Sequence, residues 1–351
     1  MTVGISLLTF VPGELGGSET YVRELLRNLA RDGQHSYRVL LPSLAPELAA
    51  GLPSEVAPEY RAGRTIPRRL LAMTEAAVRP GRLRAHLAGA EVVHYPLTLR
   101  LPPVSRPTVT SLLDVQHLDL PQMFSRGERA FRAVAWARSV RSSDRVIVIS
   151  EFVRDRAVAK LGLDPELIRV IHLGVDHERL SPGTLPREDF LLYPARRWPH
   201  KNHDRLFAAF ALLRRDHPDL RLVLTGGGDF SDAPEGVEVR GHVTTAEVGD
   251  LMRRAAALVF PSLYEGFGLP PLEAMACGCP VASSNAGSLP EVVGDAARLF
   301  DPFQPEAIAE AVDDVLRDPD EWSRRGLERA SLFSWARTAC EHDAVYGELM
   351  G

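Results

Sequence analysis

The chain has 351 residues, of which 45% are hydrophobic and 25% charged, a size and composition typical of a globular protein with two hydrophobic cores. Its net charge of −5 and the lack of a basic motif interleaved with aromatic residues argue against nucleic-acid binding. No basic segment followed by an apolar run opens the sequence, and no apolar stretch approaches the roughly 20 residues of a membrane span, so we expect a cytoplasmic protein. The cysteines form neither a disulfide framework nor a zinc ligand set, and all three are expected to be small buried hydrophobic residues: Cys277, Cys279 and Cys340.

Short apolar runs alternate with helical stretches along the first half of the chain. A strand is expected at residues 2–8, a helix at 16–30 and a strand at 37–42, and the β-rich runs continue as AEVVHYP, TVTSLLDV, RVIVIS and IRVIHLG. Such runs are typical of a parallel sheet that helices cover on both faces.

Positive charge is concentrated in the first half. Residues 1–185 carry 24 basic and 19 acidic side chains, or +5, and the remainder carries 17 and 27, or −10. Much of the excess lies in residues 61–84, where arginines interleave with Leu70, Leu71, Met73, Val78 and Leu83. Two interpretations stay open. In the first, the segment contacts an anionic acceptor or the anionic surface of a membrane, as a peripheral contact at the inner membrane face. In the second, it is a solvated helix and loop.

The alternation restarts after a segment rich in Ser, Pro, Gly and Thr near residues 180–188. Helices are expected near 203–215, near 245–255 and from residue 270, among the strands FLLYPA, LRLVLTG, VEVRGHV, AALVFPS, CPVASS and AARLF. The two series predict two doubly wound α/β domains. Their default ligand site is a cleft between them.

Candidate ligand groups lie where strands end and helices begin. Gly16 and Gly17 precede the first helix, whose free amides could meet a phosphate, although a double glycine is as typical of a plain turn. In the second half, Arg196, Arg197 and Lys201 follow a strand. They could bind an anion or form a solvated loop.

The stretch PSLYEGFGLPPLEAMACGCP, residues 261–280, favours the anion site. It predicts a strand end, a glycine loop and a helix that begins at its prolines. The amides after Gly268 and the helix dipole would favour a diphosphate. Glu265 and Glu273 could then accept hydrogen bonds from hydroxyls of a sugar and a ribose, the layout of a nucleotide sugar. Glu273 could instead simply complement the helix N-terminus, in whose first turn we place it.

The segment from Glu265 to Glu273, EGFGLPPLE, with AMACGCPVASSNAGSLPEVVGDAA after it, resembles the signature of the retaining glycosyltransferases of family four, also called group 1, which have the GT-B fold. GGSETYVRELLRNLA, RVIVISEFVRD, VIHLGVD, LVLTGGGDF and GHV occur in that family's order, and PARRWPHKN and DVQHLDLPQMF are similar to segments of bacterial O-antigen mannosyltransferases. The resemblance implies two facing Rossmann-like domains: an acceptor domain, 1–182, completed by a helix at 336–351 that crosses back, and a donor domain, 183–335.

The resemblance also assigns roles to residues. Arg196 and Lys201 would contact the donor diphosphate, Glu273 the ribose and Glu265 the transferred sugar. The loop Gly266, Phe267, Gly268 and Leu269 would bind the donor, with the amides of Gly268 and Leu269 on the phosphate, and Gly16 and Gly17 would face it from the other domain. Backbone around Gly241 to Val243 would contact the base.

One position departs from the family pattern. Relatives often carry a histidine immediately before the aspartate of this segment, and here Leu113 precedes Asp114. His117 is the nearest histidine and is our candidate for the contact with the donor sugar or acceptor. A packed loop histidine is the alternative.

The residues predict an enzyme that needs no metal and no separate cofactor. Charge on the departing nucleoside diphosphate would be met by Arg196, Lys201 and the helix amides, and a phosphate oxygen would take the acceptor's proton. The predicted function is hexose transfer, mannose in first place and from GDP-mannose, to a glycan, lipid-linked or small-molecule acceptor. A non-catalytic sugar-nucleotide-binding partner of another transferase and a sugar-nucleotide epimerase are the alternatives, because a fold alone does not assign function.

Overall fold

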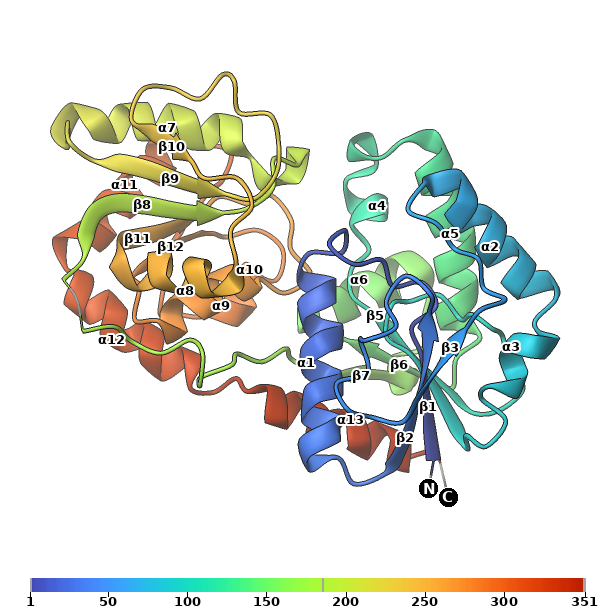
Figure 1. The fold of residues 1–351 in the computed structure, drawn as a ribbon. Coiled ribbons are helices and arrows are strands. Elements are labelled where there is room, and N and C mark those ends of the chain that lie inside the picture. The colour runs from blue at the N-terminus through green and yellow to red at the C-terminus, as the bar shows by residue number, and fades with distance from the viewer. Residues whose placement is uncertain (1, 185, 350–351) are drawn as a thin grey trace. The chain divides into compact units, whose positions relative to one another are not determined.

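The computed structural model describes residues 2–184 and 186–349, whose contacts divide the chain into two compact units. Unit 1 is the chain up to Gly174 together with the segment from Trp335 onward, and unit 2 is Val175–Ser334. The sequence predicted domain boundaries after residues 182 and 335, whereas the observed units divide after Gly174 and Ser334. Each unit is built on a parallel sheet flanked by helices (Figure 1), so the predicted α/β class is confirmed.

Unit 1 contains a seven-stranded parallel sheet in the order β3-β2-β1-β4-β5-β6-β7. Its strands are β1 (Thr2–Ser6), β2 (Ser36–Pro42), β3 (Ser54–Ala57), β4 (Val92–Tyr95), β5 (Thr108–Leu112), β6 (Arg145–Val148) and β7 (Ile168–Val170). Its helices are α1 (Gly17–Asp32), α2 (Ile66–Val78), α3 (Gly81–Ala85), α4 (Gln116–Asp119), α5 (Arg126–Arg141), α6 (Glu151–Leu161) and α13 (Trp335–Gly347), with 3-10 turns at Pro121–Met123 and Pro165–Leu167.

Unit 2 contains a six-stranded parallel sheet in the order β10-β9-β8-β11-β12-β13. Its strands are β8 (Glu188–Pro194), β9 (Arg221–Thr225), β10 (Val237–Val239), β11 (Ala255–Phe260), β12 (Val281–Ser284) and β13 (Arg298–Phe300). Its helices are α7 (His203–Asp216), α8 (Thr245–Arg254), α9 (Leu269–Ala276), α10 (Leu289–Val293), α11 (Pro305–Arg317) and α12 (Pro319–Ala330), with a 3-10 turn at Pro199–Lys201.

Both sheets reverse their strand order once, between β1 and β4 in unit 1 and between β8 and β11 in unit 2. In open α/β sheets, ligands bind beyond the carboxyl ends of the strands at such a switch point. The loops that follow β8 and β11 are therefore the expected ligand loops of unit 2.

The central strands form the cores because their side chains, apolar and polar alike, are buried. All four residues of β4 and all five of β5 are buried, as expected for parallel strands covered on both faces. Cys277 and Cys279 lie in the core of unit 2, where burial raises each thiol pKa to about 12. The prediction that Cys340 is buried was wrong: it is exposed, because it lies off the stripe that α13 buries.

A buried polar network attaches α13 to unit 1. The Tyr346 hydroxyl hydrogen-bonds to His94 Nδ1 (2.8 Å), and His94 Nε2 to Ser111 Oγ (2.9 Å). The Tyr21 hydroxyl contacts both Ser111 Oγ (2.8 Å) and His342 Nε2 (2.9 Å). All five side chains are 0% exposed, so each polar group depends on the others for its hydrogen bonds.

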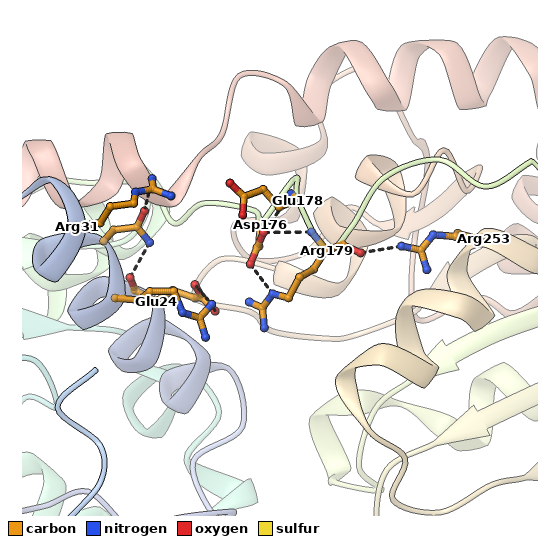
Figure 2. Close-up of polar contacts among 8 residues, drawn as sticks. Glu24, Arg31, Asp176, Glu178, Arg179 and Arg253 are labelled. Carbon is orange, nitrogen blue, oxygen red and sulfur yellow. Dashed lines mark hydrogen bonds and ion pairs between the residues drawn. The ribbon is translucent and has the colours of Figure 1, made fainter. Parts of the chain in front are cut away.

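The start of unit 2 is held by its own backbone and side chains. Figure 2 shows Asp176 accepting hydrogen bonds from the amides of Glu178 (3.1 Å) and Arg179 (3.2 Å). Arg253 Nη2 donates to the carbonyl of Arg179 (2.6 Å), and Arg253 Nε to the carbonyl of Ser181 (2.8 Å). The start of the Ser-, Pro-, Gly- and Thr-rich segment near residues 180–188 is thus bonded to the last turn of α8.

No helix within residues 2–184 and 186–349 combines the length and apolarity needed to cross a membrane.

Candidate functional site

The candidate site of unit 2 is formed by the loops that follow β8 and β11. β8 ends at Pro194, and its loop leads through Arg196 and Lys201 into α7. β11 ends at Phe260, and its loop leads through Glu265 into α9. Because β8 and β11 are neighbours at the switch point, the two loops come from the same edge of the sheet.

Lys201 and Glu265 form an ion pair. Lys201 Nζ lies 2.5 Å from Glu265 Oε1, and the two side chains are only 13% and 15% exposed. The Tyr193 hydroxyl donates to the Lys201 carbonyl (2.6 Å), and the ammonium lies 5.4 Å from the Phe260 ring centroid. The structure thus brings together two predicted site residues that are 64 positions apart.

The Glu265 loop is fixed by residues that the sequence analysis assigned no role. Ser288 Oγ donates to the carbonyls of Glu265 (3.0 Å) and Phe267 (2.7 Å). Gly287 has φ +64°, and a Cβ there would lie 2.8 Å from Glu265 N and 2.9 Å from Glu265 O. Only glycine fits without displacing the loop. The sequence signal for this turn was the stretch NAGSLPE, which directly follows the predicted strand CPVASS.

Helix α9 begins at Leu269, one residue before the predicted start at Pro270. Gly268 precedes it with φ 112°, and a Cβ there would approach Leu289 Cδ2 to 2.6 Å. The first amides of a helix have no intrahelical acceptor, and Pro270 and Pro271 carry no amide proton. Any anion at this helix end therefore depends on the amides before Pro270.

The placement of Glu273 in the first turn was wrong. Glu273 is the fifth residue of α9, whose first turn contains no acidic residue. The helix begins at Leu269, one residue before the prolines, and this shifts Glu273 into the second turn. Its side chain is half-buried, and its proposed contact with a ribose stays a prediction.

The two arginines before Lys201 differ in their surroundings. Arg196 is half-buried, and its guanidinium lies 5.6 Å from the Trp198 ring centroid. Arg197 instead donates to the Asp229 carbonyl (2.7 Å) and to Asp232 Oδ2 (2.6 Å). Arg197 therefore holds the loop after β9. The predicted contact of Arg196 with a ligand stays a prediction.

Two further residues join the loops after β8 and β11. Asn202, with φ +61°, donates through Nδ2 to the carbonyls of Pro261 (3.0 Å) and Pro302 (2.7 Å). The His200 carbonyl accepts from the Leu263 amide (2.7 Å). Burial, and after it the charge of Lys201, lower the pKa of His200 to about 4, so its ring is neutral at pH 7.

The predicted base-contacting segment lies at the end of β10. The Gly241 carbonyl accepts from the Gly226 amide (2.6 Å), and Val243 is half-buried just before α8. A Cβ on Gly227 would lie 2.7 Å from His242 Nε2. The backbone of this segment is therefore packed closely against the glycine loop after β9.

In unit 1, Gly16 and Gly17 lie at the start of α1. Gly16 caps the helix with φ 55°, and Gly17 is its first residue. A Cβ on Gly16 would meet nothing within 4 Å, so the position is open. Glu19 Oε2 accepts from the Gly13 amide (2.7 Å), which stabilises the turn before the helix.

His117 is enclosed in unit 1. It is 2% exposed, and its ring packs edge-on against Trp136 at 5.3 Å. The Arg132 guanidinium lies 4.7 Å from the ring centroids of Trp136 and Phe124. Burial, and after it Arg132, lower the pKa of His117 to about 4. Neither ring nitrogen has a partner among the described residues, and a role with substrate stays a prediction.

No group of three or more His, Cys, Asp or Glu side chains in residues 2–184 and 186–349 is arranged to hold a metal ion.

Two family models match the chain. The model of glycosyl transferases group 1 matches residues 178–330, and that of glycosyltransferase family 4 matches residues 15–179. Together they cover residues 15–330, which include the loops after β8 and β11.

Curated relatives match with about 30% identity. An O-antigen chain mannosyltransferase B of Escherichia coli is 31% identical over 65% of this chain and 66% of its own length. A D-inositol 3-phosphate glycosyltransferase of Streptomyces bingchenggensis is 32% identical over 64% of this chain and 57% of its own length. The match thus spans less than two thirds of either relative.

Solved structures share the whole fold. A sucrose-phosphate synthase from Thermosynechococcus elongatus superimposes with a TM-score of 0.80 at 22% identity, covering 99% of each chain. HepE of Anabaena, in complex with UDP and glucose, superimposes with a TM-score of 0.77 at 17% identity, covering 99% of this chain and 100% of its own. With both family models and this architecture, the chain belongs to the group 1 glycosyltransferases and has the GT-B fold.

Proposed function

We propose that this protein is a retaining glycosyltransferase that moves a hexose from a nucleoside diphosphate sugar to a hydroxyl of a glycan, lipid-linked or small-molecule acceptor. The observation that carries the proposal is the ion pair of Lys201 with Glu265 (Nζ to Oε1, 2.5 Å) in the loops after β8 and β11. A cation for a diphosphate and a carboxylate for sugar hydroxyls then lie where doubly wound sheets bind ligands.

Each candidate residue has a defined contact in this proposal. Lys201 and Arg196 bind the diphosphate from the loop after β8, and the amides of Gly268 and Leu269 bind it from the start of α9. Glu265 accepts hydrogen bonds from the transferred hexose. Glu273 accepts them from the ribose. Lys201 therefore exchanges part of its contact with Glu265 for the diphosphate when the donor binds.

The transfer breaks the bond between the anomeric carbon and the β-phosphate oxygen, and the electron pair stays on that oxygen. The acceptor oxygen bonds to the same face of the anomeric carbon, and its proton goes to the departing phosphate oxygen. Lys201 and Arg196 stabilise the growing negative charge, an effect worth about 10²–10³ in rate for one preorganised donor. Because these two cations can neutralise the diphosphate, we propose a transfer that needs no metal ion. Measuring turnover in the presence of EDTA tests this.

GDP-mannose is the donor that we propose. The mannosyltransferase name of the Escherichia coli relative supports mannose, whereas the UDP and glucose bound to HepE support a uridine donor as the competing choice. Thermal-shift measurements with GDP, UDP, GDP-mannose and UDP-glucose discriminate between the two, because a ligand stabilises the state that it binds. Since nucleotide sugars are cytoplasmic metabolites, we also propose a cytoplasmic location, which cell fractionation tests.

The central experiment measures nucleoside diphosphate release by the purified protein with each donor and a panel of glycan and lipid-linked acceptors. The Lys201→Ala variant is the matched control for the site. We expect an acceptor-dependent product whose anomeric configuration, read by NMR, equals that of the donor. An inverted product would overturn the retaining mechanism, and release by Lys201→Ala equal to the wild type would remove Lys201 from the site.

A non-catalytic sugar-nucleotide-binding partner is the second candidate. The enclosure of His117, 2% exposed and packed against Trp136, favours it, because the predicted catalytic histidine is then held away from solvent. This candidate predicts thermal stabilisation by a nucleotide sugar without turnover by the isolated protein. Turnover that requires a separate transferase would support it.

A further inference from the structure

Helix α2 exposes an apolar face to solvent. At about 100° per residue, Ala72 and Ala76 mark the buried side of the helix, and both belong to the unit 1 core. Leu70, Leu71 and Val78 lie on the other half and are 41%, 69% and 72% exposed. The only polar residue between these positions around the helix is Thr74.

This exposure is unusual for one helix. Single exposed apolar side chains are common, but several on one face mark an interaction surface. Ile66, the first residue of α2, is also 63% exposed. Apart from Thr74, the exposed half of α2 therefore lacks the polar side chains that a solvated amphipathic helix carries.

Arginines without partners surround this face. Between residues 61 and 85 there are seven arginines and one acidic residue, Glu75, a net charge of +6. Arg69 pairs with Glu14 at 2.7 Å, and Arg84 donates to the Pro103 carbonyl at 2.5 Å. Within residues 2–184 and 186–349 the side chains of the other five form no ion pair or hydrogen bond, and all are exposed: Arg61, Arg64, Arg68, Arg79 and Arg82.

We define the α2 surface as the apolar residues Ile66, Leu70, Leu71 and Val78 with these five arginines, and we propose that it docks unit 1 onto an anionic lipid bilayer. An apolar helix face with basic flanks lies in a bilayer interface, where the apolar residues enter the acyl boundary and the cations contact lipid headgroups. The helix lies on the periphery of unit 1 (Figure 1).

The charge favours a bilayer over a second copy of this chain. In a two-fold symmetric dimer the same patch faces itself, so the unpaired arginines of one copy would approach those of the other without acidic partners. A bilayer of anionic lipids supplies many negative headgroups to the same arginines. Each arginine near such a surface is expected to strengthen binding by roughly fivefold.

Co-sedimentation of the full chain with vesicles tests the proposal. We expect binding to phosphatidylcholine mixed with phosphatidylglycerol at low salt, and weak binding to phosphatidylcholine alone. Arg79→Glu with Arg82→Glu is expected to lower affinity by about 25-fold or more, two arginines at roughly fivefold each. Leu71→Ser with Val78→Ser removes the apolar half, and its binding is expected to fall by a similar factor.

A matched pair of substitutions lies in unit 2. Arg215 is exposed in α7, and Leu332 is 56% exposed, so Arg215→Glu with Leu332→Ser makes one charge reversal and one apolar loss elsewhere. We expect this control to bind vesicles as the wild type does. Circular dichroism and thermal melting confirm that each variant is folded.

Several outcomes would overturn the inference. These are no binding to the mixed vesicles at low salt, equal binding to both vesicle types, or unchanged binding after either double substitution of the α2 surface. Self-association that Leu71→Ser with Val78→Ser abolishes, without vesicle binding, would assign the surface to a second copy. The assay needs no donor sugar, so its result is separate from that of the proposed transfer.

Discussion

Replacing Glu265 by glutamine should tighten nucleoside diphosphate binding while it abolishes most turnover. In the structure Glu265 holds Lys201 at 2.5 Å, and a diphosphate must compete with that carboxylate for the same ammonium. Glu265→Gln keeps the shape of the side chain and removes its charge. Lys201 is then free for the ligand, and the transferred hexose loses the carboxylate that we propose orients it.

The size of the effect follows from the burial of the pair. Both side chains are less than one fifth exposed, at 13% and 15%, so solvent screens the interaction only in part. A hydrogen bond to a charged group contributes about 1.5–3 kcal/mol, which is about 10- to 150-fold in affinity. We therefore expect the Kd for the nucleoside diphosphate to fall by about tenfold or more. We expect kcat to fall by about 10²-fold.

Calorimetric titration with GDP and UDP, beside steady-state kinetics, measures both quantities. Glu310→Gln removes an exposed carboxylate from α11 and serves as the control, with no change expected in either quantity. The reasoning is refuted if Glu265→Gln binds the nucleoside diphosphate more weakly than the wild type. Glu265 would then hold Lys201 in its binding position rather than compete for it.

Four further predictions concern single residues. Lys201→Ala should lower kcat/KM by about 10²-fold with an unchanged circular dichroism spectrum, and near-normal kcat/KM would contradict its role. Glu273→Ala should raise the donor KM with a smaller change in kcat, because a ribose contact is made in both ground and transition states; steady-state kinetics decide. Gly287→Ala should destabilise the protein by about 1–3 kcal/mol in denaturant unfolding, because its Cβ would lie 2.8 Å from Glu265 N. The control Gly51→Ala, where φ is also positive but nothing lies within 4 Å, should cost less. Burial lowers the pKa of His342 to about 4, whereas the unfolded chain binds that proton near pH 6.5, so stability should be full above about pH 6.5 and fall by up to about 3 kcal/mol as pH drops to about 4. A melting temperature as steep with pH in His342→Gln as in the wild type would refute this origin.

The sheet architecture was predictable because each strand is a short apolar run bounded by turn residues. The helices α7, α8 and α9 begin within one residue of the expected positions 203, 245 and 270. The start of α9 was readable from Gly268 and from Pro270 and Pro271, since a glycine tolerates the turn before a helix and proline is favoured in its first turn. The predicted start of α9 was one residue too late, so Glu273 lies in the second turn rather than the first. A difference of one residue is common at helix boundaries.

Long-range contacts of polar side chains could not be predicted. Nothing in the spacing of Glu265 and Ser288 shows that the hydroxyl of Ser288 donates to the carbonyl of Glu265, because α9, β12 and the loops around them separate the two residues. The enclosure of His117 depends on Trp136, which comes from the next helix. Such contacts arise from packing between elements rather than from local propensity.

The network that attaches α13 also sets an order for making the protein. Unit 2 is continuous along the chain, so a ribosome can release all of its residues before α13 exists. Unit 1 cannot be finished then, because the partners of Tyr21 and His94 include His342 and Tyr346. Until those residues emerge, Tyr21 and His94 keep their hydrogen bonds to Ser111 but each lacks its second partner. The folding of unit 1 is therefore completed only after all of unit 2 has been synthesised.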